Sequence, residues 1–306
     1  FDLPGYLVDA LRSIVGNQYM ENCCDLFIGG ENGARIINNA NEIAHYEYGS
    51  ALASDGVFDA LNRIREGITE LELGNCLNRD GQRNSVVTVA AAGQRFKNAN
   101  LYPTENRVKL GDPISLTAGY KGGLSSRAGY AVEKEEQLPE QEKDYIKCLA
   151  GPYFAAVVTW LEQIRIGMEG RELYQKMEKV LPKERYHWEL NPGHLAGDEE
   201  WMSSPISPSS KDTLKSGMLL QIDIIPGIQG YAGASCESGV ALADADLRKQ
   251  ICREYPNLYE VFMKRRNYMR NTLNINLPEE VLPMNDTVAY YRPFFLNRGL
   301  AFVKGE

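Results

Sequence analysis

The stretch "IREGITELEL" at residues 64–73 occurs a second time, as "IRIGMEGREL" at residues 164–173. Both copies fit the pattern I-R-x-G-x-x-x-x-E-L, and the second begins 100 residues after the first (164 − 64). In the first copy the glycine suits the end of a helix over residues 41–65, and Thr69 with Glu72 predicts a capping box for the next helix. The spacing is too long for a solenoid repeat and indicates a domain made of two similar halves.

A glycine-led strand follows each copy of the repeat. The first is "GDPISLTAG" from Gly111 and the second is "GMLLQIDIIPG" from Gly217, an offset of 106 residues (217 − 111). Helices and strands that recur in the same order predict an α+β domain with two pseudo-symmetric halves. Pockets often form where such halves meet, so equivalent positions belong together. Counting six residues from each glycine pairs Thr117 with Asp223.

The composition limits the class of partner. The chain has 306 residues, of which 43% are hydrophobic and 24% charged, which is enough for a globular core. Its 33 Lys and Arg against 41 Asp and Glu give a net charge of −8, without an excess of positive charge to neutralise phosphates. No apolar run approaches the roughly 20 residues that span a bilayer. We expect no nucleic-acid and no membrane partner, and a small molecule or short peptide as the ligand.

Cysteine and histidine usage restricts the chemistry. The six cysteines include no C-x-x-C pair, and the adjacent Cys23 and Cys24 do not suit an ordinary disulfide or a zinc clip. This usage predicts reduced thiols in a cytoplasmic protein. The three histidines are His45, His187 and His194, and any imidazole chemistry must draw on them.

Five motifs follow one another in a fixed order: "NANEIAHYEYGSALASDGVFDALNRIREGITELEL" from Asn39, "LYPTENRVKLGD" from Leu101, "NPGH" at 191–194, "LKSGMLLQID" from Leu214 and "CESGVAL" from Cys236. With these motifs the sequence resembles the pita-bread family of methionine aminopeptidase, aminopeptidase P, prolidase and creatinase. It is most similar to the creatinase and aminopeptidase P branch. The resemblance implies the pita-bread (creatinase/aminopeptidase) fold, which is the α+β fold with two pseudo-symmetric halves.

The resemblance also implies a division of the chain. In that branch a separate N-terminal domain precedes the pita-bread domain, so we expect residues 1–32 to be a remnant of a preceding domain and linker, with a short strand at 26–28. The pita-bread domain is expected over residues 33–250. Residues 251–306 are expected to be a C-terminal extension that packs on the domain or on a dimer interface. Because members of the family are often dimers, we expect a homodimer.

Family metallopeptidases hold two divalent metals with two Asp, one His and two Glu. The corresponding positions here are Thr117 for the first Asp, a position near Ser126 for the second, His194 for the His, Asp223 for the first Glu and Glu237 for the last. Most of this ligand set is replaced, and both aspartates of the first half are lost. We therefore expect no metal cofactor at this site, with a single weakly bound divalent metal as the alternative.

His194, Asp223 and Glu237 are the candidate catalytic residues. His194 belongs to "NPGH" and, with a carboxylate to fix its tautomer, is suited to general-base chemistry. A histidine satisfied within the core is the alternative. Asp223 lies in an apolar strand, where a carboxylate is costly to bury unless it is paired, either in a pocket or in a structural salt bridge. Glu237 suits a cationic ligand group, or equally the amides of a turn.

Five further positions are candidates for substrate binding. Arg127 offers positive charge to an anionic substrate where relatives offer metal, although a solvated arginine near a turn is an equal alternative. Thr117 and Ser126 replace family ligands. Family histidines fall near Asn100 and Trp201.

Three functions follow from this reading. The first is a creatinase- or aminopeptidase P-like hydrolase of a C–N bond in a small molecule or X-Pro-type peptide, working without a dinuclear metal site. The second is an inactive pita-bread pseudoenzyme that serves as a ligand- or partner-binding module. The third is an active metallopeptidase, which requires acids outside the expected positions, such as Asp198 or Glu199, to complete a site.

Overall fold

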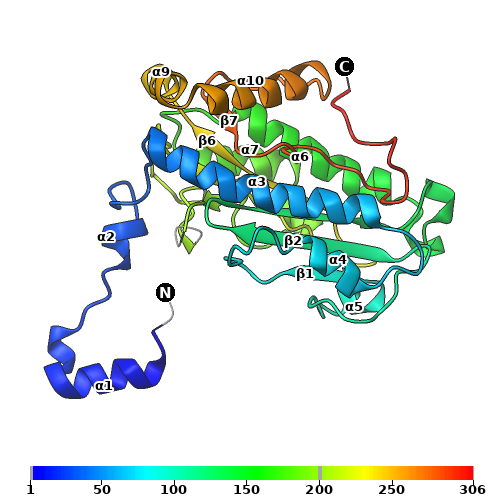
Figure 1. Cartoon of the computed structure of the whole chain (residues 1–306), viewed down its shortest axis with the longest axis horizontal. Coiled ribbons are helices and arrows are strands. Elements are labelled where there is room, and N and C mark those ends of the chain that lie inside the picture. Colours follow the sequence, from blue (N-terminus) through cyan, green and yellow to red (C-terminus); the bar gives the residue numbers. More distant parts are fainter. Residues whose placement is uncertain (1–2, 199–201, 306) are drawn as a thin grey trace.

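The computed structural model describes residues 3–198 and 202–305, and the two halves predicted from the repeat are both present (Figure 1). The elements of the first half are α3 (Ala40–Arg63), α4 (Glu70–Cys76), β1 (Val89–Ala92), β2 (Pro113–Tyr120) and β3 (Gly123–Tyr130). Those of the second half are α6 (Gly151–Gln163), α7 (Gly170–Val180), β4 (His194–Leu195), β5 (Leu219–Ile222) and β6 (Ser235–Leu242). Each half is therefore two helices followed by three strands, and the predicted α+β duplication is confirmed.

Other elements precede, connect and follow the two halves. The helices are α1 (Gly5–Val15), α2 (Cys24–Ile28), α5 (Gln94–Lys97), α8 (Lys183–Tyr186), α9 (Ala245–Glu254) and α10 (Pro256–Asn271), and the last strand is β7 (Val281–Pro283). Short 3₁₀ turns lie at Asn17–Tyr19, Glu135–Gln137 and Glu140–Glu142, and a π-helical segment, Ile146–Ala150, leads into α6. In Figure 1 α1 lies away from the body of the molecule, whereas α9 and α10 lie against it.

The strand predicted at residues 26–28 is wrong, because these residues belong to the helix α2. The side chain of Asn22 accepts a hydrogen bond from the Cys24 N–H at 2.9 Å, which gives the chain a helical start. The Gly29 N–H closes the helix on the Asp25 carbonyl. A short apolar run does not by itself distinguish a strand from a helix.

The two copies of the repeat adopt the same backbone structure. Gly67 and Gly167 have φ angles of +83° and +85°, a conformation that strains any residue with a Cβ. The Gly67 N–H donates to the Val108 carbonyl at 2.8 Å. The Gly167 N–H donates to the Leu214 carbonyl, also at 2.8 Å. α3 ends at Arg63 and α6 at Gln163, because Ile64 and Ile164 leave the helical conformation. Gly67 and Gly167 therefore lie in the turn that follows the first helix of each half and not at the helix end. The predicted capping box of Thr69 begins the second helix of the first half.

A single antiparallel sheet joins the halves in the order β1-β2-β3-β6-β5-β4, with β7 added beside β6. The order is symmetric about the junction of β3 and β6, which is the place of the pseudo-twofold axis. There Ser126 pairs with Glu237, and Ser126 also pairs with Thr117 on its other side. Equivalent strands of the two halves therefore meet in the middle of one sheet.

Strand alternation separates the two faces of this sheet. Ile114, Leu116 and Ala118 of β2 are fully buried in one apolar cluster with residues of α3 and α4. Ser115 and Thr117 point to the opposite face, because successive side chains of a strand alternate. The helices thus cover one face, and polar side chains gather on the other.

The C-terminal helices pack on the body of the domain. Ile251 of α9 and Phe262 of α10 are fully buried in a cluster that also contains Ile43 of α3 and Leu219 of β5. Among the described residues the six cysteines are free thiols. Over the same residues no helix combines the length and the apolar character that a membrane crossing requires.

Candidate active site

Three strands place polar side chains in one row on the open face of the sheet. Thr117 on β2, Ser126 on β3 and Glu237 on β6 are register partners, and Asp223 follows the last residue of β5. All four line one pocket of about 360 Å³. The structure therefore brings together four of the positions that the sequence singled out.

The two hydroxyl side chains in this row bond to each other. Thr117 Oγ1 and Ser126 Oγ are 2.7 Å apart, and either can be the donor. Neither group carries a charge, so the first half of the domain contributes neutral hydrogen-bonding groups to the pocket.

Glu237 is a buried carboxyl group at the centre of the sheet. Its side chain accepts a hydrogen bond from Ser235 Oγ at 3.0 Å. Burial raises the pKa of Glu237 well above its ordinary value, and the negative charge of Asp223 raises it further. Burial therefore favours the protonated acid, which has an O–H group that can donate a hydrogen bond to a ligand in the pocket.

This raised pKa predicts how stability depends on pH. The unfolded chain loses the Glu237 proton near the ordinary pKa, whereas the folded chain keeps it to higher pH. Stability therefore falls as pH rises through the window between these two pKa values. Glu237→Gln, which stays neutral, is expected to make this fall shallower in urea-unfolding free energies measured from about pH 4 to pH 8. Glu254→Gln on the surface of α9 is the control, and parallel profiles for Glu237→Gln and the parent chain would refute the expectation.

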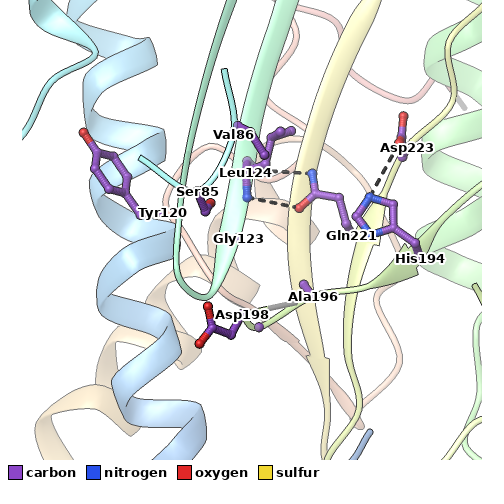
Figure 2. Close-up of a pocket in the computed structure, with 11 residues that line it drawn as sticks. Ser85, Val86, Tyr120, Gly123, Leu124, His194, Ala196, Asp198, Gln221 and Asp223 are labelled. Atoms are coloured by element: carbon purple, nitrogen blue, oxygen red, sulfur yellow. Dashed lines mark hydrogen bonds and ion pairs between the residues drawn. The ribbon is translucent and has the colours of Figure 1, made fainter. Parts of the chain in front are cut away.

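His194 and Asp223 form a pair beside this pocket, and both line the neighbouring pocket that Figure 2 shows. His194 Nδ1 lies 2.6 Å from the Leu195 carbonyl, which can only accept, so Nδ1 carries a proton. His194 Nε2 lies 3.5 Å from Asp223 Oδ2. In the neutral ring Nε2 is then an acceptor that lies beside the Asp223 carboxyl group.

A second pocket opens on the other side of Asp223. It has a volume of about 210 Å³ and is lined by Ser85, Val86, Tyr120, Gly123, Leu124, His194, Ala196, Gly197, Asp198, Gln221 and Asp223. Asp223 and Leu124 line both pockets. Asp223 Oδ1 is buried and has no hydrogen-bond partner among the residues that the structure describes. A carboxylate oxygen in this state is available to a bound ligand.

Gln221 is a site residue that the sequence reading missed. Its Nε2 donates to the Leu124 carbonyl at 3.0 Å, and its Oε1 accepts from the Leu124 N–H at 3.4 Å (Figure 2). This amide holds the start of β3 against β5, between the two pockets. The two-residue period of a strand predicts this position, because Gln221 lies two residues before Asp223 and therefore on the same face of the sheet.

Arg127 lies on the opposite face of the sheet from Ser126 and lines neither pocket. It is 1% exposed, and its guanidinium group donates to the carbonyls of Ser126, Glu237, Thr287 and Tyr290 and to Ser238 Oγ. Asn100 is exposed and lines neither pocket, although its neighbour Leu101 lines the larger one. Trp201 and Glu199 lie outside the described residues.

The larger pocket has a one-sided charge. Its described lining contains the carboxyl groups of Asp223 and Glu237, five serine, threonine or glycine positions at the strand and loop walls, and no Lys or Arg. A ligand with a cationic group complements this pocket better than an anion does.

The fold is a duplicated α+β domain with a polar pocket at the junction of its two halves. The sequence pattern of metallopeptidase family M24 matches residues 48–245. The chain belongs to metallopeptidase family M24, and the resemblance to the pita-bread family is confirmed. A search of curated proteins found no match.

Solved structures share the fold. An Xaa-Pro dipeptidase from Bacillus anthracis is similar with a TM-score of 0.58 and 22% identity, over 70% of this chain and 61% of that protein. The prolidase from Pyrococcus horikoshii gives a TM-score of 0.61 and 19% identity, over 79% of this chain and 70% of that one. The X-Pro aminopeptidase from Thermotoga maritima gives 0.60 and 18%, over 79% and 68%. The chain thus spans less than two thirds of the length of the Bacillus anthracis enzyme.

The residues present do not fit the dinuclear metal centre that the family name implies. Two divalent ions require several anionic oxygen or imidazole ligands, and Thr117 and Ser126 supply only neutral hydroxyls that already bond to each other. Within residues 3–198 and 202–305, no three His, Cys, Asp or Glu side chains are grouped so that they could hold a metal ion.

Proposed function

We propose that this chain is a hydrolase of a C–N bond in a small molecule or an X-Pro-type peptide that bears a cationic group, and that it works without a dinuclear metal centre. The observation that carries the proposal is the His194–Asp223 pair, in which Asp223 lines both pockets. The described lining of the larger pocket contains two carboxyl groups and no Lys or Arg. Membership of family M24 supports a peptidase-like hydrolase.

The side chains divide the proton transfers between them. Nδ1 of His194 keeps its proton and donates it in a hydrogen bond to the Leu195 carbonyl oxygen. Nε2 is therefore free to take a proton from water or substrate. The carboxylate of Asp223 stabilises the imidazolium that forms. Glu237, held protonated by burial, donates a proton or a hydrogen bond to the departing nitrogen. The unpartnered Oδ1 of Asp223 holds the cationic group.

Turnover of defined substrates tests the proposal. The purified chain, treated with a chelator, is incubated with X-Pro dipeptides and with small amidine and guanidine compounds, and products are identified by mass spectrometry. We expect cleavage of a C–N bond in a cationic compound and no cleavage of its uncharged analogue. Absence of every product across these classes would refute the proposal.

The lost aspartates give a separate prediction about metal. We expect the double variant Thr117→Asp, Ser126→Asp to gain binding of Mn²⁺, because four carboxylates then line one pocket, and the imidazole of His194 lies 3.5 Å from one of them, Asp223. The thermal midpoint of the variant is expected to rise by about 5 °C or more with excess Mn²⁺, while that of the parent chain stays unchanged. Thr159→Asp with Thr272→Asp, two positions outside the pocket, is the matched control. An equal rise in the parent chain would contradict the assignment of these positions.

A second candidate function is binding without turnover. The Thr117–Ser126 hydroxyl pair favours it, because two of the charged groups with which relatives are expected to activate water are absent from the pocket. In that case the compounds of the preceding experiment raise the thermal midpoint and are recovered intact. We also propose a homodimer in the cytoplasm, and light scattering on the purified chain tests the first part.

A further inference from the structure

A third cavity, distant in the fold from the strand-borne site, lies among the C-terminal helices. It has a volume of about 300 Å³ and is lined by Arg248, Tyr259, Met263, Arg266, Asn267, Arg270 and Glu279. It shares no lining residue with the two pockets around Asp223. We call it the arginine pocket.

Two of its arginines lie one turn apart on α10. Arg266 and Arg270 are separated by four residues, so their side chains share one face of the helix, where like charges repel. Arg266 is only 6% exposed, and its guanidinium group donates to the carbonyls of Leu277, Pro278 and Val281. Carbonyl oxygens satisfy its hydrogen bonds but supply no negative charge.

The other charged side chains of the arginine pocket do not neutralise the positive charges of Arg266 and Arg270. Arg248 on α9 donates to the Ala243 carbonyl at 2.8 Å and to Glu279 Oε2 at 3.3 Å. The side chain of Glu279 is 86% exposed, so this ion pair lies at the surface and is readily displaced. Among the described residues Arg270 has no ion-pair or hydrogen-bond partner. Three guanidinium groups thus face one exposed carboxylate.

We propose that the arginine pocket binds a phosphate group. The guanidinium group of Arg270, which is exposed, matches phosphate oxygens in a planar, bidentate geometry. Arg266 is held by backbone carbonyls and contributes its buried positive charge. The phosphate relieves the repulsion between Arg266 and Arg270. Tyr259 and Met263 form an apolar wall beside it, which suits the organic part of a small phosphate ester. Since the whole chain has a net charge of −8, this positive site is local.

Calorimetric titration of the full chain with inorganic phosphate tests the proposal, at an ionic strength held constant with chloride. We expect saturable binding to the parent chain and about tenfold weaker binding to Arg270→Ala, since a hydrogen bond to a charged group is lost. Glu279→Gln is expected to bind phosphate more tightly, because it removes the competing carboxylate from Arg248. Arg253→Ala, an exposed arginine on α9 outside the pocket, is the matched control.

The results separate a built site from general charge attraction. No binding to the parent chain beyond that of chloride, or an equal loss in Arg253→Ala and Arg270→Ala, would overturn the proposal. Tighter binding by Glu279→Gln cannot arise from partial unfolding and supports it. Phenyl phosphate in place of the free ion identifies the source of the group: tighter binding indicates an organic phosphate, and equal binding indicates the free ion.

Discussion

His194→Ala is expected to lower kcat/KM by about 10²- to 10⁴-fold, which is the usual contribution of a positioned general base. The expectation rests on the direction of the ring. Nδ1 is fixed by its hydrogen bond to the Leu195 carbonyl, Nε2 lies beside Asp223, and the residue lines the smaller pocket. The measurement is the rate of product formation on whichever cationic C–N substrate the chain cleaves. The pH profile is part of it, because loss of the base also removes the acidic limb of kcat/KM.

The chain offers its own control for this experiment. His45 is exposed on α3 and lines neither site pocket, so His45→Ala is expected to keep full activity. His194→Gln tests the role of position, because glutamine fills a similar volume and does not act as a base. Full activity in either His194 variant would show that another group takes the proton.

Arg127→Met is expected to destabilise the fold by about 3–5 kcal/mol, the usual effect of breaking a buried charged network. The guanidinium group of Arg127 ties carbonyls of β3 and β6 to those of Thr287 and Tyr290 in the C-terminal segment. Methionine fills the space but leaves buried carbonyls without a donor, which costs about 1–3 kcal/mol for each. Urea unfolding followed by circular dichroism measures the loss.

Arg127→Lys is expected to recover little of this stability, because an ammonium group cannot reach the same planar set of acceptors. Arg171→Met is the surface control, since that side chain is 44% exposed and pairs with Glu169 at the start of α7. A loss below about 1 kcal/mol for Arg127→Met would mean that water replaces the guanidinium, and it would remove the link between the site strands and the C-terminal segment.

The duplication could be predicted from the sequence because its markers are local. A left-handed glycine in the turn after a helix and a Thr–Glu capping box each require particular residues at particular positions. Gly67, Gly167 and Thr69 can therefore be identified from the sequence alone. The pairing of Thr117 with Asp223 also follows from counting along equivalent strands, and both side chains line the larger pocket.

The contacts within the site could not be predicted from the sequence, because they depend on which face of the sheet each residue occupies. Ser126 and Arg127 are adjacent in the sequence, and the sequence makes both of them candidates for substrate binding. Because successive side chains of a strand alternate, they lie on opposite faces of the sheet. Asn100 was selected by alignment with a family histidine, and the loop turns its side chain toward solvent instead. The bond between Leu195 and His194 joins a ring to the next backbone carbonyl, and no sequence pattern marks it.

The two halves that meet between β3 and β6 are alike in backbone and unlike in charge. Ala91 pairs with Ser115 in the first half, whereas in the second half His194 pairs with Gln221, which lies 106 residues after Ser115. The first half thus presents an uncharged wall, and among the described residues every Asp, Glu or His side chain that lines the two pockets comes from the second half. A ligand with one charged end and one uncharged end therefore has only one favourable orientation, and the polarity of the cavity, more than its shape, selects the bond that reaches His194.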